Sequence, residues 1–247
     1  MGLTKVSAAV DPNFQIYLCF GQSNMEGNAA IEDIDRTGVN PRFMAMYAVD
    51  DEKAGWKKGQ WHTAVPPQAR PDTGLTPVDY FGRKMVDNLP DSIKVGTITV
   101  AVGGASIDLF DKRTCKAYLK KQPDWMKNFA SQYNGNPYAR LIELAKIAQK
   151  QGVIKGILLH QGETNNGDAN WPNRVKTVYN DILKELHLKA EDVPLLVGET
   201  VQKDQGGSCW QHIAIVDDIA KTIPTAHVIS SKGCPQRGDG LHFIAES

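Results

Sequence analysis

The sequence predicts an α/β protein whose parallel sheet is covered by helices on both faces. Five apolar runs rich in β-branched residues recur along the 247 residues, and segments with helical periodicity lie between them. Alternation of strands and helices favours a parallel sheet. The expected strands are Phe14–Phe20, Val95–Val102, Val153–His160, Val193–Gly198 and Ala226–Ser231. The chain shows neither an internal repeat nor a linker, so we expect a single domain over residues 1–247.

The segments between these strands carry helix signals of differing strength. Thr76 is an expected N-cap, with Pro77 at the first helical position and an acidic residue in the first turn. The expected helices span Pro77–Asn88, Pro137–Ala148, Trp171–Leu188 and Ile213–Lys221. Ala29–Pro71 and Lys112–Gly135 receive no clear assignment, and long connections of this kind commonly determine specificity.

Composition excludes several classes of function. The 28 basic and 28 acidic residues cancel, so no electrostatic signature for nucleic acid or an anionic membrane is present. No apolar stretch reaches transmembrane length. The cysteines have no C-x-x-C spacing, which leaves a zinc site or a thioredoxin-like motif unsupported. They are Cys19, Cys115, Cys209 and Cys234. Reduced thiols are the default, and a disulfide between Cys209 and Cys234 is the alternative.

The N-terminus leaves the compartment open. Met1-Gly2-Leu3-Thr4-Lys5 lacks the apolar core of a signal peptide. It fits a native cytoplasmic start, and it also fits a mature secreted or periplasmic protein whose signal is absent from this sequence. We favour the second.

A polar cluster follows the first expected strand. Gly21-Gln22-Ser23-Asn24-Met25 lies where open α/β sheets place their chemistry, beyond the carboxyl ends of the strands. Ser23 is therefore a candidate nucleophile, provided that a base, an acid and oxyanion donors lie elsewhere. Its competing role is to cap the following helix, which is common for serine after a strand.

Three other strand ends carry polar or glycine-rich motifs. Gly103-Gly104-Ala105-Ser106 can expose backbone N–H groups to a ligand, or can form only a tight turn. Gln161 and Glu163 point the same way if the backbone stays extended, and otherwise belong to a solvated loop. Asp239 and His242 can face the same side of a turn, although such a pair is weak evidence alone.

The common location of these motifs supports a serine hydrolase. Ser23 would attack an acyl carbonyl, and His242 would take its proton and return it to the leaving alcohol. Either Asp239 or Glu163 would orient the imidazole. The expected oxyanion donors are the N–H of Ser23, an N–H at Gly103 or Gly104, and the Gln161 amide. The Gly-x-Ser-x-Gly elbow of α/β-hydrolases is absent.

The ordered motifs resemble the SGNH hydrolases. Gly21-Gln22-Ser23-Asn24-Met25, His160-Gln161-Gly162-Glu163 and Asp239-Gly240-Leu241-His242-Phe243 look like the sialate O-acetylesterase-like branch, and in particular like the family 6 carbohydrate esterases, the acetylxylan esterases. The resemblance spans nearly the whole chain. It implies a flavodoxin-like three-layer α/β/α sandwich with a five-stranded parallel sheet, no metal or other cofactor, and deacetylation of sugar hydroxyls. It maps the nucleophile to Ser23, the base to His242 and the oxyanion side chain to Gln161.

Two features depart from this family pattern. Both Asp239 and Glu163 are available as the acid; the spacing to His242 favours Asp239, while Glu163 is its rival in this branch. Members of the family also carry a closing helix after the Asp-x-x-His segment, whereas this sequence ends at Ser247. We expect either a shortened chain or cover supplied by neighbouring modules or a second chain.

The expected substrate is an acetylated polysaccharide or oligosaccharide, with xylan or xylo-oligosaccharides first. Sialate or another sugar O-acetyl ester is the alternative within the same class. A non-catalytic carbohydrate-binding module is the alternative from another class, and the filled positions of Ser23 and His242 argue against it. We expect substrate contacts from Gln22, Asn24, Trp61 and Asn165. Trp61 would stack on a sugar ring, or would only pin its loop to the core.

Overall fold

The computed structural model describes residues 9–247 and is built around a seven-stranded sheet with the order β3-β2-β4-β1-β5-β6-β7. Neighbouring strands pair in parallel except β2 and β3, which are antiparallel. The strands are β1 (Phe14–Gly21), β2 (Phe43–Met46), β3 (Trp61–Thr63), β4 (Lys94–Ala101), β5 (Val153–His160), β6 (Leu195–Gly198) and β7 (Ala226–Ile229). The N-terminal stretch Met1–Lys5 lies outside the described residues.

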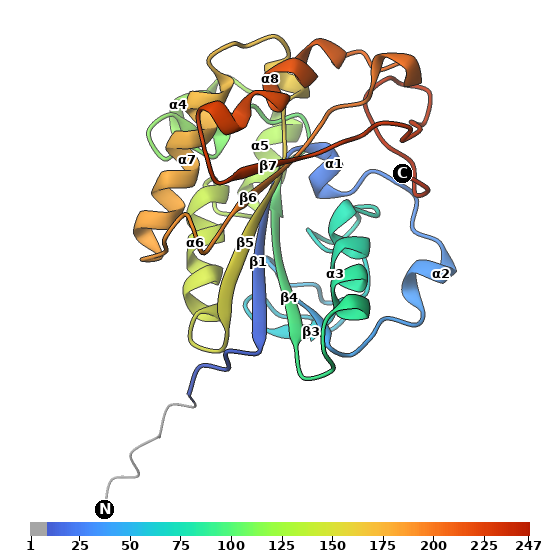
Figure 1. Cartoon of the computed structure of the whole chain (residues 1–247), viewed down its shortest axis with the longest axis vertical. Helices are drawn as coiled ribbons and strands as arrows, with labels where there is room; N and C mark the ends of the chain where they lie inside the picture. The colour runs from blue at the N-terminus through green and yellow to red at the C-terminus, as the bar shows by residue number, and fades with distance from the viewer. Residues whose placement is uncertain (1–8) are drawn as a thin grey trace, which may run out of the picture.

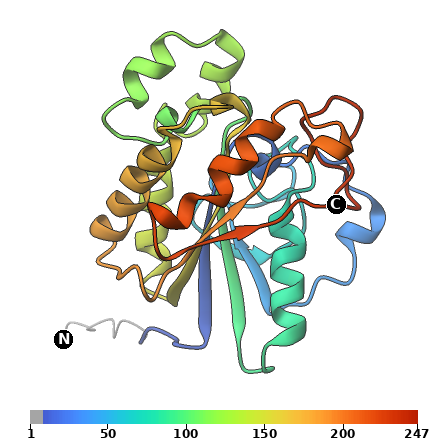
Figure 2. The same cartoon turned by 45° about the horizontal axis from the view of Figure 1, so that its top comes forward.

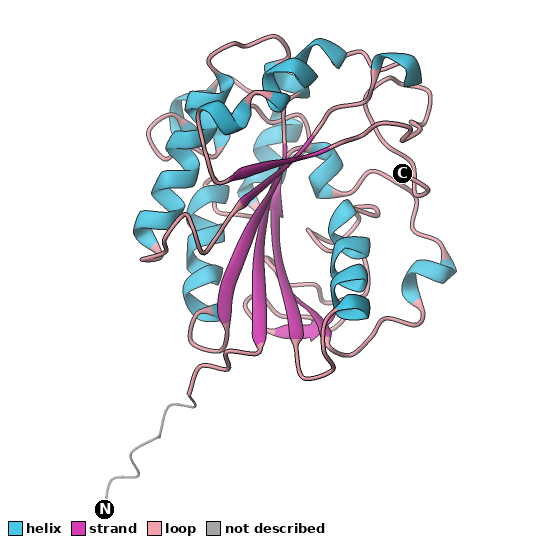
Figure 3. Cartoon of the chain, viewed as in Figure 1, coloured by secondary structure: helices cyan, strands magenta, loops and turns pink. Residues whose placement is uncertain are grey.

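Helices cover both faces of this sheet, which gives three layers (Figure 1, Figure 3). The helices are α1 (Ser23–Glu26), α2 (Asp33–Arg36), α3 (Pro77–Asn88), α4 (Cys115–Lys120), α5 (Asp124–Ser131), α6 (Pro137–Ala148), α7 (Trp171–Glu185) and α8 (Ile213–Asp217). None of the helices between residues 9 and 247 combines the length and the apolar character needed to cross a membrane.

Side chains of the central strand alternate between two cores. Ile16, Leu18 and Phe20 are fully buried in the larger core, together with apolar residues of α6 and α7. Tyr17 and Cys19 point to the opposite face and join the smaller core under α3. This period of two is the reason why the run over β1 contains hardly any polar residue: both of its faces are covered.

The predicted α/β fold is confirmed, but the expected count of five strands was wrong. All five expected strands are present with ends shifted by up to two residues, and β2 and β3 extend the sheet beyond β4. Both lie in the segment Ala29–Pro71, which received no assignment. β2 is short and contains no β-branched residue, so it lacks the sequence signal by which a strand is recognised.

The helix predictions hold best where caps are present. Thr76 caps α3 in a capping box with Asp79, and α6 has the expected bounds. The expected helix Ile213–Lys221 is instead broken into α8 and a short 3₁₀ turn. All four cysteines are free, so the alternative of a disulfide between Cys209 and Cys234 is wrong.

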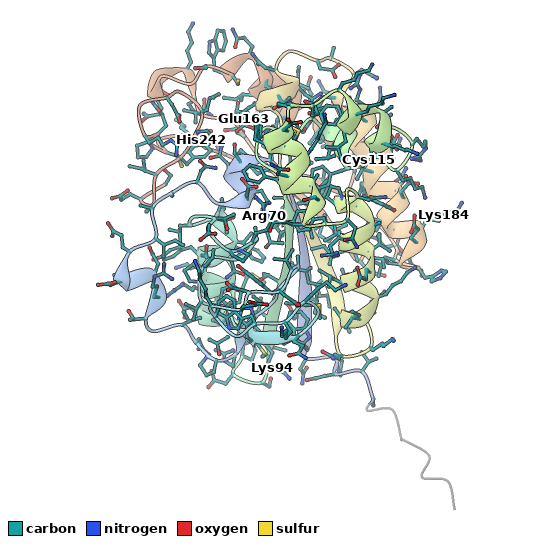
Figure 4. The ribbon with its side chains drawn as sticks, turned by 180° about the vertical axis from the view of Figure 1, so that it is seen from behind. Arg70, Lys94, Cys115, Glu163, Lys184 and His242 are labelled. Carbon is teal, nitrogen blue, oxygen red and sulfur yellow. The ribbon has the colours of Figure 1, made fainter. Side chains whose placement is uncertain are left out.

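The carboxyl ends of the parallel strands meet at one edge of the sheet, where α4, α5 and the C-terminal loops are gathered (Figure 2). Figure 4 labels Lys94, which begins β4, at the opposite end of the molecule from Glu163 and His242. The topology therefore brings the candidate residues of the sequence to a common edge.

Candidate active site

Ser23 is placed at this edge by a tight turn at the end of β1. Gly21 ends the strand, and a Cβ atom there would lie 2.0 Å from the carbonyl oxygen of His160 on β5. Only glycine fits this close approach of two backbones. Ser23 is the first residue of α1 and is buried, so the helix and the surrounding residues fix the position of its side chain.

Ser23, His242 and Asp239 form a continuous hydrogen-bonded series. The Oγ atom of Ser23 lies 2.8 Å from Nε2 of His242, and Nδ1 of His242 lies 2.7 Å from Oδ2 of Asp239. These contacts join the start of the chain to its end. An imidazole held in this way by a carboxylate presents an unprotonated Nε2, which can accept the proton of the serine hydroxyl.

The Asp239 carboxylate is fixed by donors other than the imidazole. Its Oδ1 accepts the backbone N–H groups of Leu241 and His242, each at 2.9 Å, and Nε of Arg237 donates to Oδ2 at 2.7 Å. Partial burial raises the pKa of Asp239, but the hydrogen bonds from His242, Arg237 and Leu241 outweigh it and hold the pKa well below its usual range. The group is therefore ionised at neutral pH.

Glu163, the rival acid, reaches His242 only indirectly. Its Oε1 accepts a hydrogen bond from Nδ2 of Asn24 at 2.8 Å. Asn24 in turn donates to the carbonyl of Leu241 and accepts the N–H of Phe243, and so it holds the residues on both sides of His242. Asn24 is 4% exposed, and its expected role in contacting substrate is not supported: the side chain is used to fix the loop.

Both polar atoms of the Gln161 amide form hydrogen bonds within the protein, which contradicts its expected role as an oxyanion donor. It is 1% exposed, and its Nε2 lies within hydrogen-bond distance of oxygens of Gln22, Ala105 and Asn165. Its Oε1 accepts the indole N–H of Trp171 at 2.6 Å. A side-chain amide has only two hydrogens, so none remains for a ligand.

Two further residues expected to touch substrate are tied to this amide. Asn165 uses its Oδ1 for Gln161 and for the N–H of Ile107, so its substrate role is also not supported. Gln22 is 3% exposed and uses its Oε1 to fix Gln161 and the loop that contains Gly162 and Thr164. It still contributes to the wall of the cavity described next.

Backbone N–H groups remain as donors near Ser23. The N–H of Gly103 donates to Glu26 at 3.0 Å and is thereby occupied. Gly104 has a φ angle of +71°, and among the described residues neither its N–H nor that of Ser23 donates a hydrogen bond. Of the expected oxyanion donors, the geometry therefore leaves the N–H groups of Ser23 and Gly104.

A cavity of about 620 Å³ opens above these atoms. Its lining includes Ser23, His242 and Gly104 together with Trp125 and Phe129 of α5. The rings of Trp125 and Phe129 meet edge to face with centroids 5.9 Å apart, and Trp125 is 49% exposed. A largely apolar wall with a few polar groups is typical of a small-molecule pocket.

The expected aromatic contact at Trp61 is wrong. Trp61 lies on β3, at the far side of the sheet, and its ring packs against Phe14 with centroids 4.8 Å apart. Phe14 begins β1, whereas Ser23 follows the other end of that strand. Trp125 was missed because it lies in the unassigned segment Lys112–Gly135. Apolar residues at positions i and i+4 of Asp124–Ser131 were the signal for it.

Within residues 9–247 there is no group of three or more histidine, cysteine, aspartate or glutamate side chains arranged to hold a metal ion. The site as described consists of a hydroxyl, an imidazole, a carboxylate and backbone donors. This combination can carry out acyl transfer.

The chain is similar to a known protein family and to solved structures. Residues 13–247 match the model of a family described as carbohydrate esterase, sialic acid-specific acetylesterase. A protein from Arabidopsis thaliana is structurally similar with a TM-score of 0.69 and 19% identity, over 96% of this chain and 92% of the other. NanS has a TM-score of 0.62 and 16% identity, over 92% and 81%.

A third solved structure is a carbohydrate acetylesterase from Xanthomonas citri, with a TM-score of 0.57 and 20% identity. The similarity covers 90% of this chain and 51% of that protein, so this chain spans about half of it. At these identities the three structures establish a common fold.

Proposed function

Because the chain belongs to the carbohydrate esterase family of sialic acid-specific acetylesterases, we propose that it removes O-acetyl groups from carbohydrate through an acyl-enzyme on Ser23. The observation that carries this proposal is the short contact between Ser23 Oγ and His242 Nε2, with Asp239 behind the imidazole. A carbohydrate-binding module without catalysis would have no need for this series of contacts.

The proposed reaction has two halves. Ser23 Oγ attacks the acetyl carbonyl while its proton passes to Nε2 of His242, and the imidazolium then protonates the sugar oxygen as the bond to it breaks. A water molecule, deprotonated by the same imidazole, then attacks the acetyl-serine. The imidazolium returns the proton to Ser23 Oγ as the acyl bond breaks, and acetate is released. The N–H groups of Ser23 and Gly104 are the proposed donors to the oxyanion that forms in each half.

The charges of the cavity support a neutral sugar as substrate. The acidic residues of its lining are Glu26, Asp72 and Glu163, and its guanidinium, that of Arg70, is paired with Glu26 and only 2% exposed. Asp72 is exposed, so a carboxylate on the substrate would meet a like charge, and the described residues of the lining offer no unpaired guanidinium or ammonium group to balance it. We therefore place acetylated xylan or xylo-oligosaccharides first.

A sialate O-acetyl ester is the second candidate, for two reasons. The description of the matching family names sialic acid. In addition, the side chain of Arg237 is 45% exposed beside His242 and could pair with a substrate carboxylate from the rim of the site. Its Nε already donates to Asp239, so such a carboxylate would compete with an existing ion pair.

A substrate panel separates the two candidates. We expect kcat/KM for acetylated xylo-oligosaccharides to exceed that for O-acetylated sialic acid, with acetylated cellobiose between them, as measured by acetate release. Asp72→Asn should improve the sialate ester about fivefold and leave the xylo-oligosaccharide unchanged, because a like charge near the surface costs about 1 kcal/mol. A wild-type preference for the sialate ester would reverse the order of the candidates.

Trp125 is expected to bind the sugar rather than the acetyl group. Trp125→Ala should raise KM for acetylated xylo-oligosaccharides about fivefold, since stacking on an aromatic face contributes about 1 kcal/mol. Turnover of p-nitrophenyl acetate, which lacks the sugar, should stay unchanged. Trp61→Ala is the matched control: it should lower the melting temperature without changing KM. If Trp125→Ala lowered kcat/KM equally for the xylo-oligosaccharide and for p-nitrophenyl acetate, Trp125 would not be a sugar-binding residue.

A further inference from the structure

The wall of the cavity contains a buried ion pair that the proposed reaction does not use. Glu26 is the last residue of α1, the helix that Ser23 begins, and it binds Nη2 of Arg70 through Oε1. The two side chains are 8% and 2% exposed. Removing two charges from water is costly, and the replacement of such pairs by apolar residues is often neutral or stabilising. The pair therefore calls for an explanation beyond stability.

Arg70 connects this pair to the end of β4. Its Nη1 donates to the carbonyl of Ala101 at 2.6 Å and lies 3.4 Å from the hydroxyl of Tyr133. The guanidinium also lies over the ring of Phe129, 4.8 Å from its centroid. Ala101 is the last residue of β4, directly before the loop that carries the two glycines. One cation thus fixes the strand end, the wall of the cavity and the helix that begins with Ser23.

Glu26 completes the connection on the other side of the loop. Its Oε1 accepts the N–H of Gly103 at 3.0 Å, and a Cβ atom on Gly103 would lie 2.7 Å from Oε2. The neighbouring N–H groups are also occupied: that of Val102 donates to Gly21, and that of Ala105 donates to Val102. Gly104 alone among these four keeps a free N–H within the described structure.

We infer that Glu26 and Arg70 are positioning residues for the oxyanion site. They hold the peptide of Gly103 against α1, and this leaves the N–H of Gly104 free at a fixed distance from Ser23. Neither side chain touches the reacting atoms; each acts through the backbone of the glycine loop. The inference rests on the proposed function, in which an oxyanion forms when Ser23 attacks the acetyl carbonyl.

A graded series of substitutions tests this inference. Glu26→Gln keeps an acceptor for Gly103 but loses the charge, and we expect kcat to fall about tenfold; Glu26→Ala removes the acceptor and should cost about a hundredfold. KM should stay within twofold in both variants, because the oxyanion contact exists only in the transition state. A rise in KM at unchanged kcat would overturn the inference, since it would indicate a substrate contact.

Arg70→Lys has a matched control in Arg140→Lys. Arg140 is similarly buried at 5% exposure and donates to the carbonyl of Ala48, but it does not line the cavity. Both substitutions should lower the melting temperature, and only Arg70→Lys should lower kcat. Equal kcat in these two folded variants would overturn the inference. If Glu26→Ala fails to fold, Glu26→Gln decides the question: kcat within twofold of wild type would refute the positioning role.

Ser23→Ala, measured beside the series, distinguishes a failure of the positioning role from a failure of the proposed function. If Ser23→Ala is inactive and the Glu26 and Arg70 variants are fully active, only the positioning role fails. If Ser23→Ala retains activity, the proposed function fails, and the inference fails with it.

Discussion

Replacing Ser23 with alanine should reduce acetate release by at least about 10⁴-fold, because loss of a serine nucleophile removes the acylation path and leaves only binding and oxyanion stabilisation. The substitution deletes one hydroxyl and one hydrogen bond, to Nε2 of His242, from a side chain that is 9% exposed. The fold should therefore persist. Turnover of acetylated xylo-oligosaccharides and of p-nitrophenyl acetate would measure the loss of activity, and circular dichroism would show whether the fold persists.

Ser231→Ala is a suitable control for this prediction. Ser231 is similarly buried, at 5% exposure, and its hydroxyl donates to the carbonyl of Thr200 at 2.6 Å, outside the cavity that contains Ser23. We expect full activity with a modest loss of stability. Labelling by an organophosphonate should also modify wild type and Ser231→Ala but not Ser23→Ala. Undiminished turnover in Ser23→Ala would refute the mechanism.

The positions of Ser23, Asp239 and His242 could be predicted from sequence because they follow from topology. Each lies beyond the end of an expected parallel strand, and parallel strands end at the same edge of a sheet. A local rule also applies to the pair Asp239 and His242, since three residues of separation in a turn bring both side chains together. Neither inference needs knowledge of distant packing.

The roles of Gln161, Asn24 and Asn165 could not be predicted in the same way. Whether a polar side chain faces a ligand or is used internally depends on partners far away in sequence. Asn24 is held by Glu163, 139 residues away, and by the backbone around His242. Buried polar groups find protein partners in most cases, so a polar residue next to Ser23 can serve to support the structure instead of binding a ligand.

The aromatic wall shows a second limit. Trp61 and Trp125 both lie in segments without a clear assignment, yet Trp61 packs on Phe14 at one end of the sheet and Trp125 lines the cavity at the other. The difference arises because β3 is the outermost strand of the sheet and pairs with β2, and β2 carries no recognisable strand signal. Missing that strand removed the only basis for placing Trp61 correctly.

Comparison of Asp239→Asn with Glu163→Gln should give very unequal losses of activity. Asp239→Asn should lower kcat by about 10³- to 10⁴-fold, because an asparagine no longer stabilises the imidazolium or holds the tautomer that leaves Nε2 free. Glu163→Gln should cost no more than about tenfold, since a glutamine oxygen can still accept the hydrogen bond from Asn24. Both variants conserve side-chain size, so differences in packing contribute little.

The pattern of losses distinguishes an acid that contacts the imidazole from one that acts through Asn24. Asn24→Ala should resemble or exceed Glu163→Gln, and combining the two should add little, because both changes release the same loop around His242. Combined with either Asn24→Ala or Glu163→Gln, Asp239→Asn should lower kcat by its full additional factor. A larger loss in Glu163→Gln than in Asp239→Asn would mean that Glu163 orients His242 during turnover. In that case the hydrogen bond between Asp239 and His242 would exist in the free enzyme but not during turnover.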